Sequence, residues 1–329
     1  MVVARLGSPL CIGIKKEGFF VGSDATPFID STREVIYLED FEMTELNCGS
    51  PIKIYNVKTN QFTSPSIETL KWNLESIQKG GYSHFMLKEI FEQPKAIENT
   101  FSGRLIESNK TIKLSGLDYL IDRIDDFKRI IILGCGTSWH AGLVGEYLFE
   151  KLIRIPVEVE YASEFRYRDP IISSDDFVIV ISQSGETADT LEALKIAKRL
   201  GAYVFGICNV VGSSIARETF SGLYTHAGPE IGVASTKAFL TQIAALQMLA
   251  LKLASIKKTL NKEEISNYFD ELKAVPIKIS QLLKNSEKIK KIARDLFKSN
   301  NTLFLGRGFN FPVALEGALK MKEISYIHS

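Results

Sequence analysis

The sequence has few of the residues that build metal sites and disulfide frameworks. Its 329 residues include only four cysteines and four histidines. The cysteines (Cys11, Cys48, Cys135 and Cys208) lie far apart without a CxxC pair, and the histidines are equally scattered. This spacing offers no metal-ligand pattern, so we expect no metal and no other cofactor. Scarce, unpaired cysteine is typical of a reduced, cytoplasmic protein.

The chain also lacks an excess of either charge and a long uninterrupted apolar run. Its formal net charge is +1, which creates no basic field for nucleic acid or an acidic membrane surface. The N-terminal residues lack the apolar run of a signal peptide, so we expect none. The most apolar stretch, residues 238–254, contains Thr241, Gln242, Gln247 and Lys252. It predicts a buried core helix, and we expect neither a nucleic-acid nor a membrane partner.

Residues 3–57 are rich in β-forming side chains. Turn residues such as those at 47–50 separate short apolar runs. Because four short strands bury too little surface to be stable alone, we expect the final part of a larger β-containing domain that begins before Met1. The predicted strands are 9–14, 18–22, 34–38 and 52–57.

Residues 60–118 have the pattern of a connector packed between domains. Two helices are predicted there, at 68–78 and 86–99, the second kinked or restarted at Pro94. Charged and aromatic side chains alternate along the segment, which favours packing over a flexible tether.

Strand and helix patterns alternate from residue 117 onward. Such alternation predicts an α/β fold with a doubly wound parallel sheet flanked by helices. The predicted strands are 129–134, 157–161, 176–181 and 203–208, and the predicted helices are 117–127, 139–152, 188–199, a short one near Ser214, and 238–253.

Two glycine- and hydroxyl-rich loops follow predicted strands. The sequence Ser-Gln-Ser-Gly-Glu-Thr at 182–187 joins strand 176–181 to helix 188–199, and Cys-Gly-Thr-Ser at 135–138 follows strand 129–134. Open α/β sheets bind ligands at the carboxyl ends of their strands, and a helix start favours anions. Ordinary helix capping would use the same residues. The paired loops favour an anion pocket that contains neither Lys nor Arg.

The last forty residues repeat an earlier pattern. Residues 304–308 resemble 132–136, and a helix pattern follows both. We therefore expect a second α/β unit to begin near Ile289 and to be truncated at Ser329. In its helix, Glu316, Lys320 and Glu323 share one face, which fits either a solvated salt-bridge row or an acid–base site.

The remaining reactive side chains have plainer interpretations. Cys135 lies at a helix start, where a thiol pKa is lowered, but a small residue tucked under the loop is the more usual role. His140 and His226 are interpreted as structural or surface residues.

Four segments together resemble the glutamine–fructose-6-phosphate aminotransferases. They are Cys-Gly-Thr-Ser at 135–138, Ser-Gln-Ser-Gly-Glu-Thr-Ala-Asp-Thr at 182–190, Glu-Ile-Gly-Val-Ala-Ser-Thr-Lys-Ala-Phe at 230–239 and Leu-Glu-Gly-Ala-Leu-Lys-Met-Lys-Glu-Ile-Ser-Tyr-Ile-His at 315–328. The resemblance implies sugar-isomerase (SIS) domains. It divides the chain into the C-terminal part of an N-terminal-nucleophile (Ntn) glutaminase domain (1–59), a connector (60–118), a first SIS domain (119–284) and the start of a second (285–329).

The resemblance also implies an activity, the synthesis of glucosamine 6-phosphate from fructose 6-phosphate and glutamine for amino-sugar production. Glu323 matches the base that moves a proton between C1 and C2, Lys320 assists it, and Glu316 lines the same region. The sugar phosphate would contact Thr137, Ser138, Ser182, Gln183, Ser184 and Thr187, with Cys135, Gly136, Val233 and Ser235 around the sugar. A homodimer is expected.

The resemblance leaves parts of that site outside the sequence. The cysteine nucleophile and glutamine-binding loops would precede Met1, and the ring-opening histidine and Schiff-base lysine would follow Ser329, since His328 belongs to the matching Tyr-Ile-His run. Glutamine would bind only the full-length enzyme, and we expect this chain to be inactive alone. The alternatives are a non-catalytic phosphosugar-binding SIS module, a deaminase-type SIS enzyme, and a fragment without a ligand.

Overall fold

The structure, a computed structural model, describes residues 1–7, 10–23, 25, 28, 31–70, 79–118 and 120–329. The chain forms two compact units, Met1–Gly80 and Gly81–Ser329. The first unit is β-rich, and the second is α/β.

The described part of the first unit contains two four-stranded antiparallel sheets. Their strand orders are β1-β5-β6-β7 and β3-β2-β4-β8. Alternate residues point to opposite faces of a strand, so Ile12, Ile36 and Ile54 of the two sheets meet in one buried cluster. The strands are β1 (Val2–Ala4), β2 (Cys11–Lys15), β3 (Gly18–Gly22), β4 (Glu34–Tyr37), β5 (Glu42–Glu45), β6 (Ile54–Asn56), β7 (Gln61–Thr63) and β8 (Glu68–Thr69).

The predicted strands of this unit are present, but the helix predicted at 68–78 is wrong at its start. Glu68 and Thr69 form β8, which pairs antiparallel with β4. The sheet edge beside β4 offers this segment backbone hydrogen bonds, and that pairing overrides a weak local helix pattern. Residues 71–78 of the predicted helix lie outside the described residues. Strands β1, β5, β7 and β8 were not predicted.

The second unit contains a five-stranded sheet with the order β12-β11-β13-β14-β15. Every pairing in it is parallel, which confirms the predicted doubly wound sheet. The strands are β11 (Arg129–Gly134), β12 (Val157–Tyr161), β13 (Asp176–Ser182), β14 (Tyr203–Cys208) and β15 (Ser221–Tyr224). The edge strand β15 was not predicted.

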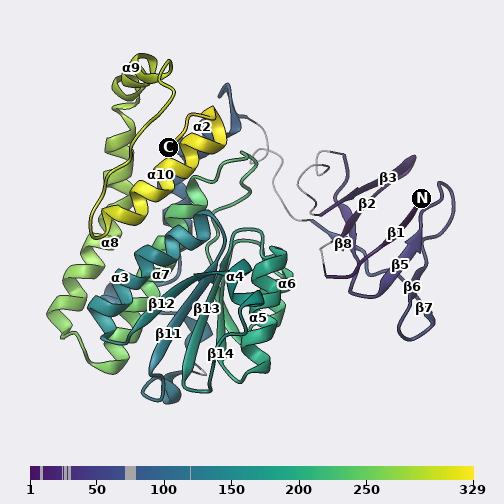
Figure 1. Ribbon diagram of the computed structural model, residues 1–329, viewed down its shortest axis with the longest axis horizontal. Helices are drawn as coiled ribbons and strands as arrows, with labels where there is room; N and C mark the ends of the chain where they lie inside the picture. Colours follow the sequence, from purple (N-terminus) through teal and green to yellow (C-terminus); the bar gives the residue numbers. More distant parts are fainter. Residues whose placement is uncertain (8–9, 24, 26–27, 29–30, 71–78, 119) are drawn as a thin grey trace. The chain divides into compact units, whose positions relative to one another are not determined.

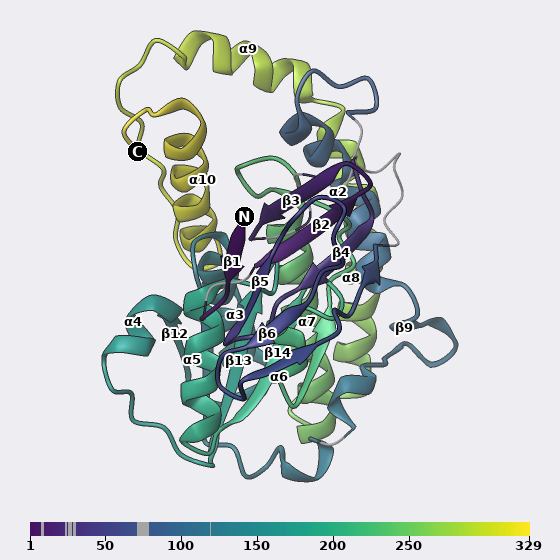
Figure 2. The same ribbon diagram turned by 90° about the vertical axis from the view of Figure 1, so that its right-hand side faces the viewer.

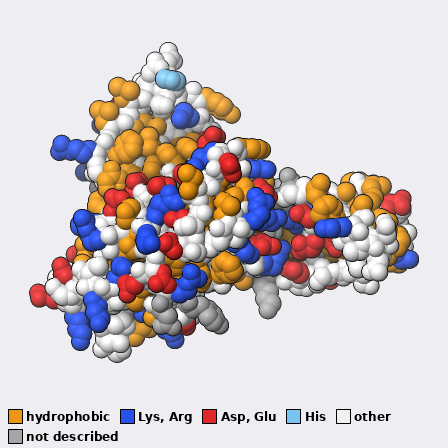
Figure 3. Space-filling view, turned by 60° about the horizontal axis from the view of Figure 1, so that its bottom comes forward, with side chains coloured by type: hydrophobic (Ala, Val, Ile, Leu, Met, Phe, Trp, Pro, Cys, Tyr) orange, Lys and Arg blue, Asp and Glu red, His pale blue; other side chains and the backbone are white. Residues whose placement is uncertain are grey.

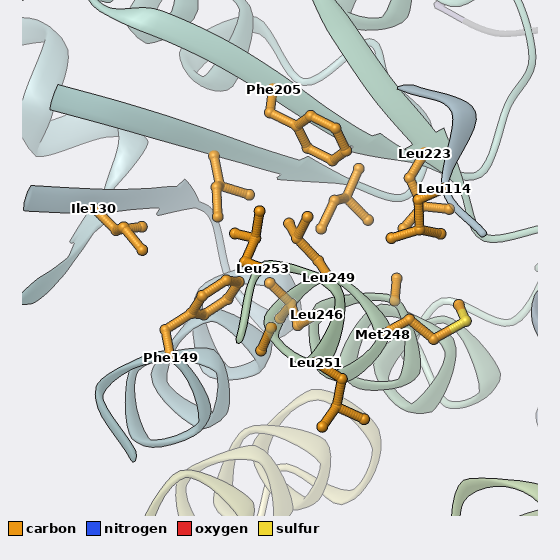
Figure 4. Close-up of a cluster of buried hydrophobic side chains, with 14 of the residues drawn as sticks. Leu114, Ile130, Phe149, Phe205, Leu223, Leu246, Met248, Leu249, Leu251 and Leu253 are labelled. Atoms are coloured by element: carbon orange, nitrogen blue, oxygen red, sulfur yellow. The ribbon is translucent and has the colours of Figure 1, made fainter. Parts of the chain in front are cut away.

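Helices cover both faces of this sheet (Figure 1). Ile130 and Ile132 of β11 pack with α3 (Thr137–Ile153) and α7 (Lys237–Lys257). Ile131 and Leu133 pack with α4 (Ala162–Tyr167) and α5 (Ala188–Arg199) on the other face, where α6 (Ser214–Glu218) also lies. In Figure 4, Phe205 of the sheet and the α7 leucines form one apolar layer. A strand buried on both faces explains the continuous β-branched runs in the sequence.

Helix α7 is the one helix, among the residues described, that is long and apolar enough to cross a membrane. In its most apolar window, 67% of the residues are buried inside the protein. It is therefore the core helix that its sequence predicts.

The second unit begins and ends in helices. They are α2 (Phe85–Phe101), α8 (Lys262–Leu283), α9 (Ser286–Leu296) and α10 (Asn310–Ser325). Helix α2 runs through Pro94 without a break, so the predicted restart is wrong. Figure 2 shows the chain passing from α8 through α9 and returning in α10 toward α3.

Two predicted elements of this unit are absent. In place of the helix predicted at 117–127, the described residues form a 3-10 turn at Ile121–Arg123, preceded by another at Ser115–Leu117. Leu117, Leu120 and Ile124 are buried, and their spacing suits a series of 3-10 turns as well as an α-helix. Residues 304–308, whose pattern resembles the end of strand 129–134 and its loop, form no strand, because a strand needs a partner and the only pairing described nearby is one bridge between Asn301 and His328.

Candidate functional site

The strand order reverses its direction between β11 and β13. From β11 the chain passes through α3 to β12 on one side, and it then crosses back to β13 on the other side. Such a reversal is the topological switch point where open α/β sheets bind ligands. Leu133 pairs with Val180 in register, so the loops at 135–138 and 182–187 leave neighbouring strands at the same edge.

The hydroxyls of the 182–187 loop are directed toward one another. Ser182 Oγ lies 2.9 Å from Thr187 Oγ1 and accepts a hydrogen bond from the Gly185 N–H at 2.9 Å. Ser184 Oγ accepts from the Glu186 N–H at 3.1 Å. Each hydroxyl has one proton that can rotate. The hydroxyl that donates within the Ser182–Thr187 pair can therefore donate its hydrogen bond to an arriving anion instead, without movement of the backbone.

The start of α5 remains open to an anion. Thr187 is the N-cap residue of α5, yet its side chain makes no capping bond because its hydroxyl faces Ser182. The N–H groups of the first helical turn and the helix dipole both favour negative charge. Gln183 is half-buried beside them.

The 135–138 loop turns the chain sharply into α3. Gly136 is the N-cap of α3 with φ +54° and ψ −124°, a conformation that suits only glycine. The Cys135 thiol is half-buried, with Sγ 3.9 Å from Thr190 Oγ1. Ser138 is buried and accepts a hydrogen bond from Gln242 Nε2 at 3.0 Å. A hydroxyl that accepts from an amide keeps its own proton for another acceptor.

Helix α10 brings its charged face onto the start of α3. Lys320 Nζ lies 3.4 Å from Glu316 Oε1, 2.6 Å from Glu323 Oε2 and 3.0 Å from Thr137 Oγ1. Thr137 Oγ1 donates to Glu316 Oε1 at 2.9 Å, and His140 Nδ1 lies 2.6 Å from Glu316 Oε2. The structure thus joins side chains that are about 180 residues apart in the sequence.

The two carboxylates of this face differ in their surroundings. The side chain of Glu316 is 7% exposed and has three partners, whereas that of Glu323 is 36% exposed and pairs with Lys320. Glu323 is therefore the more exposed carboxylate of the pair, and Glu316 is enclosed by its partners.

A third loop, residues 225–236, carries Val233 and Ser235. Val233 is 94% exposed, so its side chain is available to a ligand. Ser235 Oγ donates to Glu230 Oε2 at 2.9 Å, and Glu230 Oε1 accepts from the N–H groups of Thr236 and Ala238 at the start of α7. Glu230 therefore caps α7 and orients the Ser235 hydroxyl at the same time.

Three polar residues near these loops were not predicted as site residues. His140, interpreted from sequence as structural or surface, is buried against Glu316. Gln242 is an amide inside an apolar helix pattern, and its contact with Ser138 explains that exception. Glu230 lies within the 225–236 loop and caps α7. A polar residue within an otherwise apolar helix pattern, such as Gln242, was the sequence signal that could have identified such residues.

Metal chemistry finds no support around these loops. Among the described residues, no group of three or more His, Cys, Asp and Glu side chains could hold a metal ion.

Burial raises the pKa of Cys208, at the end of β14, to about 12, so this thiol stays protonated at neutral pH.

Comparison with known proteins places this geometry in a family. A model of the SIS domain matches residues 124–252. The glutamine–fructose-6-phosphate aminotransferases (isomerizing) of Chlorobaculum tepidum and Bacteroides thetaiotaomicron are 56% and 50% identical to this chain over 100% of its length. The chain spans about half of these curated relatives, 53% in each case.

A solved structure matches about three quarters of the chain. The C-terminal domain of glucosamine-fructose-6-phosphate aminotransferase from Francisella tularensis has a TM-score of 0.73 and 44% sequence identity, covering 76% of this chain and 70% of that one. The family model and the solved structure agree with the α/β fold described above. The chain belongs to the glutamine–fructose-6-phosphate aminotransferase family.

Proposed function

We propose that the second unit binds a hexose 6-phosphate, fructose 6-phosphate or glucosamine 6-phosphate, at the switch point between β11 and β13. The observation that supports this proposal is the hydrogen bond from Lys320 to Thr137, which brings the Glu316–Lys320–Glu323 face against the 135–138 loop. Phosphate would lie on Ser182, Ser184 and Thr187, with Gln183 and Ser138 beside it.

The loop chemistry suits a substrate that must also leave. Hydroxyls and backbone N–H groups bind phosphate by hydrogen bonds, and the 182–187 loop contains no Lys or Arg that would add an ion pair. Binding the substrate too tightly would lower its energy without speeding the reaction. The sugar would extend toward Cys135, Gly136, Val233 and Ser235.

Glu323 would act as the general base. Isomerisation moves a proton between C1 and C2, and a carboxylate can take and return it. Lys320 pairs with Glu323 at 2.6 Å and so orients its carboxylate, while Thr137 and Glu316 fix the position of Lys320.

The chain would work as part of a longer enzyme. In that enzyme, fructose 6-phosphate and glutamine give glucosamine 6-phosphate, and residues 1–59 would complete an Ntn-type glutaminase domain that releases ammonia from glutamine. We propose a homodimer in the cytoplasm. Basic and acidic side chains are interspersed on the face shown in Figure 3, which suits a small-molecule enzyme better than a nucleic-acid-binding protein.

Calorimetry with fructose 6-phosphate tests the phosphate site. A hydrogen bond to a charged group is worth about 1.5–3 kcal/mol, so the double variant Ser182→Ala/Thr187→Ala should bind at least about 10²-fold more weakly. The double variant Thr111→Ala/Ser174→Ala, which removes two exposed hydroxyls elsewhere, is the matched control. Equal binding by the wild-type chain and the Ser182/Thr187 variant would refute the phosphate site.

A further inference from the structure

The loop at 225–236 has little regular structure of its own, yet it carries Val233 and Ser235. Backbone without helix or strand pairing must be held by other groups. Here the groups come from α2, a helix more than 120 residues earlier in the chain. Its side chains contact the loop segment at its start, at its middle and just beyond its end.

Glu89 of α2 makes the central contact. Its Oε1 accepts from the N–H groups of Ile231 at 2.6 Å and Gly232 at 3.0 Å, and its Oε2 lies 3.3 Å from the Gly232 nitrogen. Glu89 is only 2% exposed. Burial raises the pKa of Glu89, while the two backbone N–H groups act in the opposite direction. Burying a carboxylate is costly unless hydrogen bonds compensate it, so these two bonds are the reason the carboxylate can lie here.

Gly232 is required for this contact. A Cβ at residue 232 would lie 2.6 Å from Glu89 Oε2 and 3.3 Å from the Cα of Met86. Both distances are shorter than ordinary packing allows, so any side chain at 232 would push the loop away from α2.

Two further contacts hold the loop segment at its ends. Thr100 of α2 donates to the carbonyl of Thr225, and Lys237, which is buried, pairs with Glu92 of α2 at 2.7 Å. Along the loop, Ile231 and Gly232, which Glu89 holds, lie between the two anchored positions Thr225 and Lys237. The base of the loop is thus fixed, whereas Val233 two residues beyond Ile231 is exposed.

We propose that Glu89 is a positioning residue for the sugar part of the ligand, acting through the backbone of Ile231 and Gly232 on Val233 and Ser235. This inference rests on the proposed function, because it assumes that a sugar phosphate binds at the switch point. Glu89 touches no part of the 182–187 loop in the hydrogen bonds described, so phosphate binding there does not depend on it. Glu89 therefore contributes to affinity for the sugar and not for inorganic phosphate.

Two ligands and four variants of the chain test this separation. Glu89→Ala should weaken fructose 6-phosphate binding at least about 10-fold, because two buried N–H groups lose their acceptor. Inorganic phosphate, measured by ³¹P NMR titration, should bind within about 2-fold of wild type, since its hydroxyl site is intact. Glu89→Gln retains one acceptor oxygen and should restore binding of the sugar phosphate to within about 3-fold.

Glu98→Ala is the matched control, because Glu98 is an exposed carboxylate on the same helix. It should leave binding of both ligands unchanged. Gly232→Ala approaches the same contact from the loop side, and it should lower affinity for fructose 6-phosphate alone. The Gly232→Ala variant tests the same contact if Glu89→Ala does not fold.

Each other outcome has one meaning. Equal binding of fructose 6-phosphate by wild type, Glu89→Ala and Gly232→Ala overturns the positioning role and leaves the proposed function standing. An equal loss of both ligands also overturns it, because it assigns Glu89 to general folding. A wild-type chain that binds neither ligand contradicts the proposed function itself.

Discussion

Gly185, at the centre of the 182–187 loop, should not tolerate a side chain. Its φ is +69°, and an added Cβ would lie 1.9 Å from Ser213 Oγ and 2.4 Å from Ser213 Cβ. The change Gly185→Ala therefore has two costs, one from the left-handed backbone and one from overlap with Ser213. The two costs can be measured separately, because the overlapping atoms belong to the Ser213 side chain, which the change Ser213→Gly removes.

The left-handed conformation of an L-residue costs about 1–2 kcal/mol, and over-packing costs about 1–3 kcal/mol. Gly185→Ala should therefore lower the free energy of unfolding of the second unit by about 2–5 kcal/mol. Ser213→Gly alone should cost only a few tenths of a kcal/mol, because Ser213 is an N-cap where glycine is tolerated. The double variant Gly185→Ala/Ser213→Gly should regain the part of the unfolding free energy that is lost through overlap with Ser213, about 1–3 kcal/mol.

Urea unfolding followed by circular dichroism at 222 nm measures these differences, since all described α-helices lie in the second unit. Gly201→Ala is the control: Gly201 has φ +97° and nothing within 4 Å of its Cβ position. It should show the backbone cost alone, about 1–2 kcal/mol. Calorimetry on the same proteins should show weaker phosphate binding by Gly185→Ala only.

Two results would refute this reasoning. A loss below about 0.5 kcal/mol for Gly185→Ala would mean that the loop adapts freely, contrary to the close packing of protein interiors. No recovery in the Gly185→Ala/Ser213→Gly double variant would mean that Ser213 is not the obstacle.

Two other predictions concern a carboxylate and the thiols. In a chain extended to the length of its relatives, Glu323→Gln should slow C1–C2 proton transfer about 10²–10⁴-fold, measured as glucosamine 6-phosphate formation. Its affinity for the sugar phosphate, measured by calorimetry, should be nearly unchanged. Synthesis near the wild-type rate would make Glu323 a surface ion-pair residue. At pH 8, iodoacetamide should modify the exposed Cys48 first and Cys208 only after unfolding. The pKa of Cys208 is about 12, so its thiolate fraction at pH 8 is about 10⁻⁴. This fraction rises only as the pH approaches 12. Early labelling of Cys208 in a mass-spectrometric time course would contradict its burial.

Much of the α/β fold follows from local patterns. The buried β-branched runs of β11, β13 and β14 predict strands, and their ends agree with the structure to within a residue. Where local patterns fit two conformations, prediction fails: Leu117, Leu120 and Ile124 fit both a helix and the 3-10 turns that form. At Glu68 and Thr69, pairing with β4 decided the outcome.

The candidate site divides in the same way. The Ser182–Thr187 loop and the Glu316–Lys320–Glu323 face are visible in the sequence, because turn residues and helical spacing are local properties. Whether each predicted residue contacts a sugar phosphate stays a prediction. The contacts of His140 with Glu316 and of Glu89 with Gly232 have no local signature, because their partners are more than 100 residues away.

The sequence by itself determined the alternation of strands and helices, the two hydroxyl loops and the charged row, since each depends on neighbours within a few residues. Only the tertiary structure decided the strand order that places those loops at one switch point, and the docking of Lys320 on Thr137. The physical reason is that hydrophobic burial and hydrogen bonding between distant segments choose among arrangements that local propensity leaves equal. A site built from several segments therefore exists only in the folded chain.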